Sequence, residues 1–202
     1  MSSATYWITQ LAVAVSAAAG VLEAGKKRFD LFGMILIAFA AALGGGSLRD
    51  LLLDRTVFWV ADQNYLLVAL GAGLATFFAA RWVRLPANVF LIPDAAGLAL
   101  FTVAGTNVAL AMHVPWLVAS FMGVITGVMG GVLRDVLCNE EPLVFRGTLY
   151  ATVAWLGSLL LILAIYSGAV PGVSAIAAGI LIFAVRLIAI RWDIGLPKFR
   201  SR

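Results

Sequence analysis

The sequence predicts an all-α membrane protein with seven transmembrane helices, arranged as an inverted three-plus-three helix repeat plus a seventh helix. Two observations predict the helices. Of the 202 residues 63% are hydrophobic and only 12% are charged, and the mean hydropathy is +1.04. The apolar residues also fall into stretches of about 20, the length at which a helix crosses the hydrocarbon of a bilayer. The third observation, a glycine-Arg-Asp motif that occurs twice, predicts the repeat.

The same composition excludes other classes of protein. Soluble domains carry about 25% charged residues, so a soluble enzyme or a nucleic-acid-binding protein is excluded despite the pI of 9.6. The apolar content excludes disorder. A single cysteine, Cys138, cannot form an internal disulfide, a structural zinc site or an iron–sulfur cluster. We expect no cofactor, no metal centre and no nucleic-acid partner.

The chain divides into seven apolar spans with short connections, and we treat residues 1–202 as one transmembrane domain. The first repeat covers about residues 6–84, the second about 89–168, and the seventh helix about 173–190. In chain order, the expected spans are Tyr6–Leu22, Leu31–Leu53, Tyr65–Val83, Val89–Ala111, Trp116–Leu137, Thr148–Tyr166 and Val173–Ile190.

The loop charges predict the orientation of the chain, because basic residues favour the cytoplasmic side. The side opposite the N-terminus holds Lys26, Lys27, Arg28, Arg81, Arg84, Arg146, Arg191, Lys198, Arg200 and Arg202. The other side has only Arg55. We therefore expect a multi-pass protein of the inner (plasma) membrane with its N-terminus outside and its C-terminus in the cytoplasm. Membrane lipids are expected partners of the basic residues.

An internal repeat relates the two halves of the chain. The segment Gly44–Asp50 recurs as Met129–Asp135, with Arg49 and Arg134 separated by 85 residues, and Tyr65 falls on Tyr150 at the same offset. Each copy holds three spans, so the second copy enters the membrane from the opposite side. Inverted repeats of this kind are common in transport proteins.

Glycine clusters lie in spans 2 and 5, at Gly44, Gly45 and Gly46 and at Gly130 and Gly131. Each glycine costs about 1 kcal/mol in a helix interior, and it leaves the neighbouring backbone carbonyls accessible. We expect both helices to open at these clusters, where free carbonyls can bind a dehydrated alkali cation. The alternative is that the glycines serve close helix packing.

Each glycine cluster is followed one turn later by a charged pair, Arg49–Asp50 and Arg134–Asp135. At 1.5 Å per residue the two pairs lie about 20 Å apart along the membrane normal. We therefore expect each pair to serve its own half, fixing the helix and bordering one vestibule. The alternative is an arginine that anchors its span at the membrane surface.

Asp94 is a further charged residue at membrane depth, early in span 4, and its counterpart in the first repeat is Thr9. It has no adjacent arginine, so we expect its carboxylate to attract permeating cations. The alternative is a helix N-cap after Pro93.

An enzymatic function has little support. The one histidine, His113, lies in a short loop without a nearby acid, and no Ser/His/Asp set, metal-ligand cluster or phosphate loop is visible.

Five stretches resemble the prokaryotic branch of the trimeric intracellular cation (TRIC) channel family: Asp30–Gly33, Gly44–Asp50, Asp94–Leu98, Gly130–Leu137 and Arg186–Trp192. The resemblance covers nearly the whole chain. It implies a homotrimer, an ion pathway inside each protomer, helices broken at the glycines, and potassium as the main permeant ion. The same domain also carries the label of a glycine transporter.

The chain departs from the family pattern at two places. Met129 stands where a third glycine is common, and Ser47 and Leu48 occupy the region of the basic lipid-binding motif of eukaryotic members. We expect a potassium-permeable monovalent cation channel. The alternative is a secondary transporter for a small amino acid such as glycine, and a third possibility is a non-conducting scaffold.

Overall fold

The protein is described by a computed structural model that covers residues 3–27, 29–82, 86 and 88–197. Regular structure in these residues is helical, apart from one isolated bridge between Thr148 and Gly195. The helices in chain order are α1 (Ser3–Ala24), α2 (Leu31–Leu52), α3 (Phe58–Ala61), α4 (Asn64–Trp82), α5 (Leu91–Ala111), α6 (Trp116–Leu137), the 3₁₀ turn η1 (Leu143–Phe145), α7 (Ala151–Tyr166) and α8 (Pro171–Trp192).

Among the described residues, six helices are long and apolar enough to cross a membrane, namely α1, α2, α4, α5, α6 and α8. The helix α7 is also apolar but has 16 residues. The bounds expected from the sequence agree with these helices to within three residues. Val83 and Arg84, where the third span and the first repeat were expected to end, lie outside the described residues.

The expected start of the sixth span, Thr148, is wrong by three residues because the chain there is extended. The amide of Leu149 donates to the carbonyl of Ile194 over 2.9 Å, and Thr148 bridges Gly195. Tyr150 then has φ −129° and ψ −81°, outside the helical region, so α7 begins at Ala151. The loop before α7 is thus held by the residues that follow α8.

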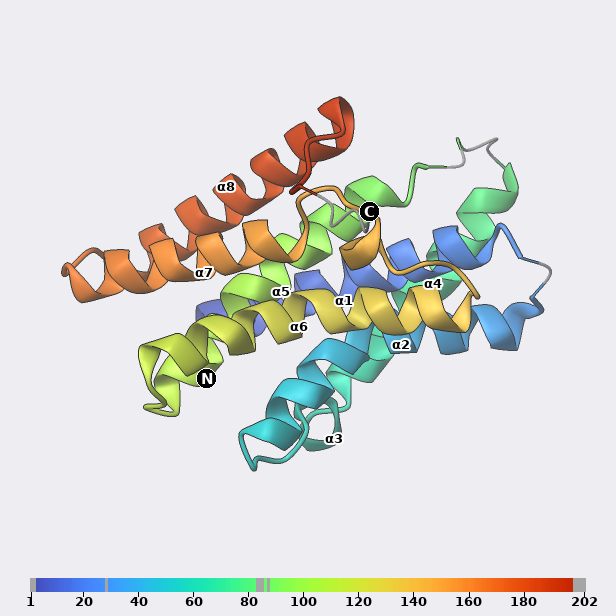
Figure 1. Ribbon diagram of the computed structural model, residues 1–202. Helices are drawn as coiled ribbons and strands as arrows, with labels where there is room; N and C mark the ends of the chain where they lie inside the picture. The colour runs from blue at the N-terminus through green and yellow to red at the C-terminus, as the bar shows by residue number, and fades with distance from the viewer. Residues whose placement is uncertain (1–2, 28, 83–85, 87, 198–202) are drawn as a thin grey trace.

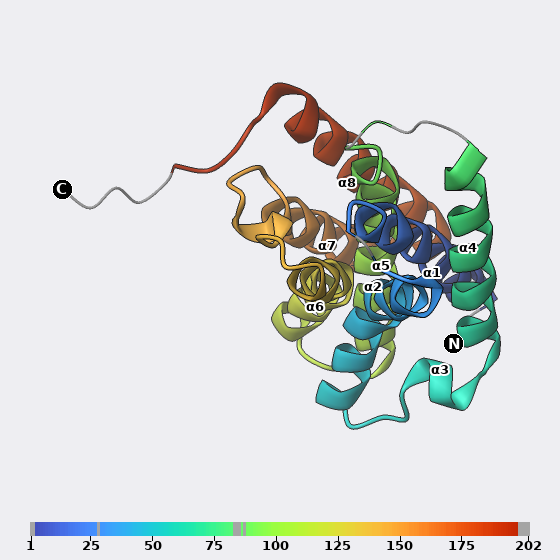
Figure 2. The ribbon, with the colours of Figure 1, turned by 90° about the vertical axis from the view of Figure 1, so that its right-hand side faces the viewer.

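The long helices run in alternating directions along one axis (Figure 1). The helices α1 and α5 lie in the interior, α2 packs against α6, and α4 covers α1 and α2 at one edge. At the other edge α8 packs against α5 and α7 (Figure 2). The second half of α2 turns away from the first half in both views, although the helix is continuous.

Candidate functional site

The glycine clusters form the contact between α2 and α6. A Cβ added to Gly45 would overlap the carbonyl oxygen of Thr126, and one added to Gly130 would overlap the carbonyl oxygen of Ala41. Both helices are continuous across the clusters. Neither helix is opened in this structure, although α2 bends, and the glycines here provide close packing through small residues, the alternative. Helix propensity alone predicts a break, but tertiary packing outweighs it.

This helix contact is reciprocal. Ala41 and Thr126 are separated by 85 residues, and so are Gly45 and Gly130. Each glycine therefore meets the carbonyl that lies four residues before the other glycine. The remaining glycines face side chains: Gly44 faces Leu133, Gly46 faces Phe58, and Gly131 faces Tyr150, Asp94 and Arg134.

The charged pair of the first repeat binds only residues close to it in the sequence, among the residues that the structure describes. Arg49 Nε donates to Asp50 Oδ1 over 2.8 Å, and Arg55 Nε lies 3.4 Å from the same oxygen. The other carboxylate oxygen of Asp50 accepts the backbone amide of Phe58 over 2.8 Å. The Arg49 guanidinium carbon lies 5.6 Å from the centre of the Phe58 ring. Asp50 thus joins the end of α2 to the start of α3.

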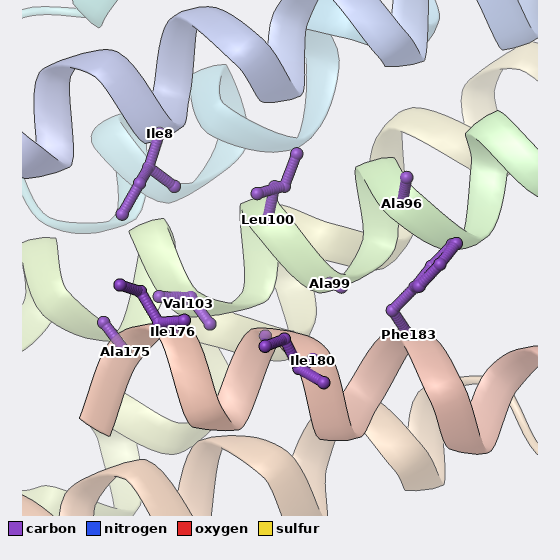
Figure 3. Close-up of a pocket in the computed structure, with 10 residues that line it drawn as sticks. Ile8, Ala96, Ala99, Leu100, Val103, Ala175, Ile176, Ile180 and Phe183 are labelled. Carbon is purple, nitrogen blue, oxygen red and sulfur yellow. The ribbon is translucent and has the colours of Figure 1, made fainter. Parts of the chain in front are cut away.

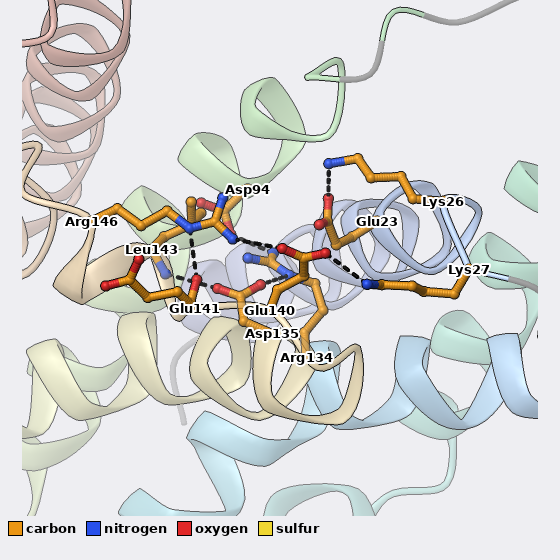
Figure 4. A network of polar contacts seen from close by, with 10 residues as sticks. All are labelled: Glu23, Lys26, Lys27, Asp94, Arg134, Asp135, Glu140, Glu141, Leu143 and Arg146. Atoms are coloured by element: carbon orange, nitrogen blue, oxygen red, sulfur yellow. Dashed lines mark hydrogen bonds and ion pairs between the residues drawn. The ribbon is translucent and has the colours of Figure 1, made fainter.

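The second repeat copies this arrangement and adds to it (Figure 4). Arg134 Nε donates to Asp135 Oδ1 over 2.8 Å, and Asp135 Oδ2 accepts the amide of Leu143, which opens η1, over 2.9 Å. In addition, Arg134 Nη1 donates to Asp94 Oδ1 on α5 over 2.5 Å. Tyr150 donates its hydroxyl to the same oxygen over 3.3 Å. The second site therefore joins two long helices, α5 and α6, to η1 and to the loop before α7.

All of these charges are inside the protein. Arg49 and Arg134 are each 1% exposed, and Asp50, Asp135 and Asp94 are at most 5% exposed. Neither arginine anchors its span at the membrane surface, so that alternative is wrong. The ion pairs lie within each repeat, as expected from the spacing.

The sequence predicts that Asp94 has no arginine partner, and this prediction is wrong. Asp94 pairs with Arg134, which follows 40 residues later in the chain. It does not cap α5 either, because the N-cap residue Phe90 has no side-chain cap and the Asp94 carboxylate faces α6 and α7. Only the fold brings Asp94 to Arg134. Tyr150 was missed as a site residue, although its match to Tyr65 was visible in the repeat.

The two sites differ in charge and in unpaired atoms. Arg49 and Arg55 against Asp50 leave the first site with formal charge +1, whereas Asp94 and Asp135 against Arg134 leave the second with −1. In the second site Asp94 Oδ2 and Arg134 Nη2 are buried without a hydrogen-bond partner among the described residues. Arg134 Nη2, like Asp94 Oδ1, lies next to the space that Gly131 leaves. Carboxylate oxygen at such a place suits a cation or a water molecule.

Ion pairs also connect the loops at the end of the molecule near the second site (Figure 4). Lys26 pairs with buried Glu23 over 2.6 Å, and Lys27 pairs with Glu140 over 2.7 Å. Arg146 lies 3.3 Å from Glu140. The Lys27–Glu140 hydrogen bond raises the pKa of Lys27 and lowers the pKa of Glu140. These contacts join the loop after α1 to the loop after α6.

An apolar groove of about 290 Å³ lies where α8 meets α1 and α5 (Figure 3). Its walls include Ile8, Leu100, Ile180 and Phe183, and it contains none of the glycines of the clusters and none of the paired charges. The groove is therefore separate from the charged sites.

Comparison with known proteins places this fold and these buried charge motifs in a class, the polytopic α-helical membrane proteins of the TRIC type. The structure of the TRIC trimeric intracellular cation channel orthologue from Rhodobacter sphaeroides is 34% identical to the chain, with a TM-score of 0.90, covering 96% of this chain and all of that one. A prokaryotic TRIC channel structure in 0.5 M KCl is 26% identical, with a TM-score of 0.89, over 97% of this chain and 100% of that chain.

Sequence relatives agree with the structural match. The chain is 42% identical over 197 residues to the UPF0126 inner membrane protein YadS of Escherichia coli K12, over 96% of this chain and 95% of that protein. It is 38% identical to a UPF0126 membrane protein of Vibrio cholerae, over 98% and 84%. A family model described as glycine transporter matches twice, at residues 6–81 and 91–166. The chain belongs to the prokaryotic TRIC channel family.

Proposed function

We propose that the protein is a potassium-permeable channel for monovalent cations and not an enzyme. The observation that carries the proposal is similarity over the whole chain to proteins described as TRIC cation channels, 34% identical in the Rhodobacter protein. The buried charge sites on either side of a glycine-packed contact fit it, because charges inside a membrane domain mark ion pathways. By the same similarity we propose a homotrimer with a pathway in each protomer.

The topology belongs to this proposal. Seven crossings, with α7 as the shortest, give two three-helix repeats of opposite orientation and a final helix. The double match of the family model at an offset of 85 residues supports the repeat, and the loop charges support an outside N-terminus. The relative from Escherichia coli is named an inner membrane protein, which supports insertion in the inner membrane.

In the proposed pathway the pore residues are Gly44, Gly45, Gly46, Gly130 and Gly131, with Asp94 and the motif charges Arg49, Asp50, Arg134 and Asp135. The tight α2–α6 contact corresponds to a closed pathway, since backbone meets backbone there. Movement of α2 away from α6 would free the carbonyls of the glycine clusters, which replace part of the hydration shell of the cation.

The experiment is single-channel recording on the purified protein in a planar bilayer under a potassium gradient. Discrete openings that reverse near the potassium potential support the channel, and silence contradicts it. Asp94→Asn should reduce conductance most in dilute potassium, where screening is weak. The matched control is Asp30→Asn, which removes the same charge from an exposed residue and keeps the N-cap of α2.

A second candidate, a secondary transporter for a small amino acid, rests on the description of the matching family model as glycine transporter. Saturable uptake of radiolabelled glycine into proteoliposomes, without channel openings, would favour it. Potassium flux that is indifferent to glycine would remove it.

A further inference from the structure

We propose that Arg186 of α8 is a positioning residue for the Asp94–Arg134 pair, and that it acts through Tyr150. The inference deepens the proposed function, because it says how the second charge site is held in shape. It also assigns a role to α8, the helix outside the duplication, namely to position Tyr150.

Arg186 binds the loop before α7 at three consecutive residues. It is 1% exposed, and its Nη1 donates to Thr148 Oγ1 over 3.0 Å and to the carbonyl of Leu149 over 2.7 Å. Its guanidinium carbon lies 4.6 Å from the centre of the Tyr150 ring. Among the described residues no carboxylate pairs with this arginine. The buried guanidinium thus contacts one aromatic ring and two neutral oxygens, and it holds the ring and the oxygens in place.

The backbone after α8 holds two of these three residues, Thr148 and Leu149. Leu149 donates to Ile194, Thr148 bridges Gly195, and the amide of Ile194 turns back to the carbonyl of Ala189 over 3.1 Å. The segment before α7 is therefore clamped between the side chain of Arg186 and the chain after α8.

Tyr150 transmits this position to the charge site. It is buried, its ring contacts Arg186, and its hydroxyl donates to Asp94 Oδ1, the oxygen that also accepts from Arg134. Without Arg186 the ring loses one wall, and the donor to Asp94 loses its orientation. The Asp94 carboxylate then rotates about the Arg134 bond and changes the field that a cation meets.

The first repeat is a natural control. Tyr65 corresponds to Tyr150 and is 2% exposed, but its hydroxyl has no partner among the described residues. Thr9 stands in the place of Asp94 and donates to the carbonyl of Thr5. Among the described residues α8 packs against α7 and has no comparable packing against α4. In that part of the chain the tyrosine–carboxylate bond is found in the second repeat, whose helices α5 and α7 pack against α8.

The test is a double-mutant cycle in the full-length protein in proteoliposomes, with potassium flux measured at low and high salt. Arg186→Met and Tyr150→Phe should each lower the ratio of low-salt to high-salt flux by about 2- to 10-fold, the range of one lost hydrogen bond. The double variant should fall no further, because both changes act on one path. Arg191→Met, which removes the same charge from an exposed position of α8, should leave the ratio unchanged.

Additive losses of the flux ratio in the double variant overturn the inference, and so does an equal loss in Arg191→Met. An unchanged ratio with lower flux at every salt concentration also overturns it, because that is the effect of a purely structural role. If Arg186→Met does not fold, Arg186→Lys, which keeps the positive charge but loses the planar guanidinium over the Tyr150 ring, replaces it in the same cycle with Tyr150→Phe. Absence of flux in the unmodified protein rejects the channel instead. The cycle of Arg186→Met with Asp94→Asn is then read on thermal unfolding, where non-additivity supports the positioning role and additivity overturns it.

Discussion

Arg49 and Arg134 occupy equivalent positions in the two repeats, and each donates to the aspartate that follows it over 2.8 Å. They differ in their second partner. Arg134 reaches Asp94 on another helix, whereas the corresponding residue of the first repeat, Thr9, bonds its own helix. The local motif is therefore symmetric and its surroundings are not. Both copies of the repeat keep the bond between neighbouring arginine and aspartate. A difference at another position, Thr9 in one copy and Asp94 in the other, gives the two sites different charges.

The largest expected loss of stability is for Arg134→Met, and it should exceed the loss for Arg49→Met. Arg134→Met leaves Asp94 and Asp135 buried without their shared cation, and it should lower the free energy of unfolding by about 3–5 kcal/mol. Arg49→Met should cost less, because Asp50 keeps Arg55 and the Phe58 amide. Chemical unfolding in detergent micelles measures both. Equal losses would show that the second carboxylate does not matter to stability.

Asp94→Thr gives the second repeat the residue of the first. The loss of charge-assisted bonds from Arg134 and Tyr150 should destabilise the protein by about 1.5–3 kcal/mol. Thr9→Val removes one neutral bond in the first repeat and should cost about 0.5–1.5 kcal/mol. Both are read from the same unfolding curves, and a larger loss for Thr9→Val would contradict the assignment of the asymmetry to Asp94.

The glycine contact should behave symmetrically where the charges do not. Gly45→Ala and Gly130→Ala each force a Cβ onto a carbonyl of the facing helix, and each should cost about 1–3 kcal/mol, the usual penalty of overpacking. The control is Gly71→Ala on α4, where nothing lies within 4 Å. It should stabilise the helix by up to about 1 kcal/mol. Unequal losses of stability for Gly45→Ala and Gly130→Ala would contradict the conclusion that the contact is energetically symmetric.

The smallest expected effect belongs to the partly exposed Lys27–Glu140 pair. The lowered pKa of Glu140 means that its contribution is present at neutral pH and is lost as the pH falls below the ordinary value of 4.5. The raised pKa of Lys27 means that its contribution is lost only at a pH above 10.5. Lys27→Ala should therefore lower the thermal midpoint slightly at pH 7 and not at all below the Glu140 titration. A pH-independent shift would assign the effect to packing.

The helices were predictable from the sequence because hydrophobic stretches of membrane length have few other interpretations. The bounds of α6, Trp116–Leu137, were predicted without error. The start of α7 was not, because residues 194 and 195 hold the chain at Thr148 and Leu149 in extended form. Long-range backbone pairing leaves no periodic signal in a sequence.

The charge sites were predictable in part. The pairing of Arg49 with Asp50 follows from adjacency, whereas the pairing of Arg134 with Asp94 spans 40 residues and needs the fold. The glycines could be located from the sequence, but their part in the packing of α2 against α6 could not. A glycine that weakens a helix and a glycine that admits a neighbouring backbone look the same in one sequence. Only the facing carbonyls of Ala41 and Thr126 distinguish them.

The reciprocal contact of Gly45 with Thr126 and of Gly130 with Ala41 has a consequence for the origin of the chain. A surface in which residue i meets j and j meets i is self-complementary, the property of an interface between two identical subunits. A chain consisting of one repeat with this surface would be complementary to a second copy of itself. Joining two such copies requires a connection between α4 and α5 but no new interface, and it lets the charges of each half differ.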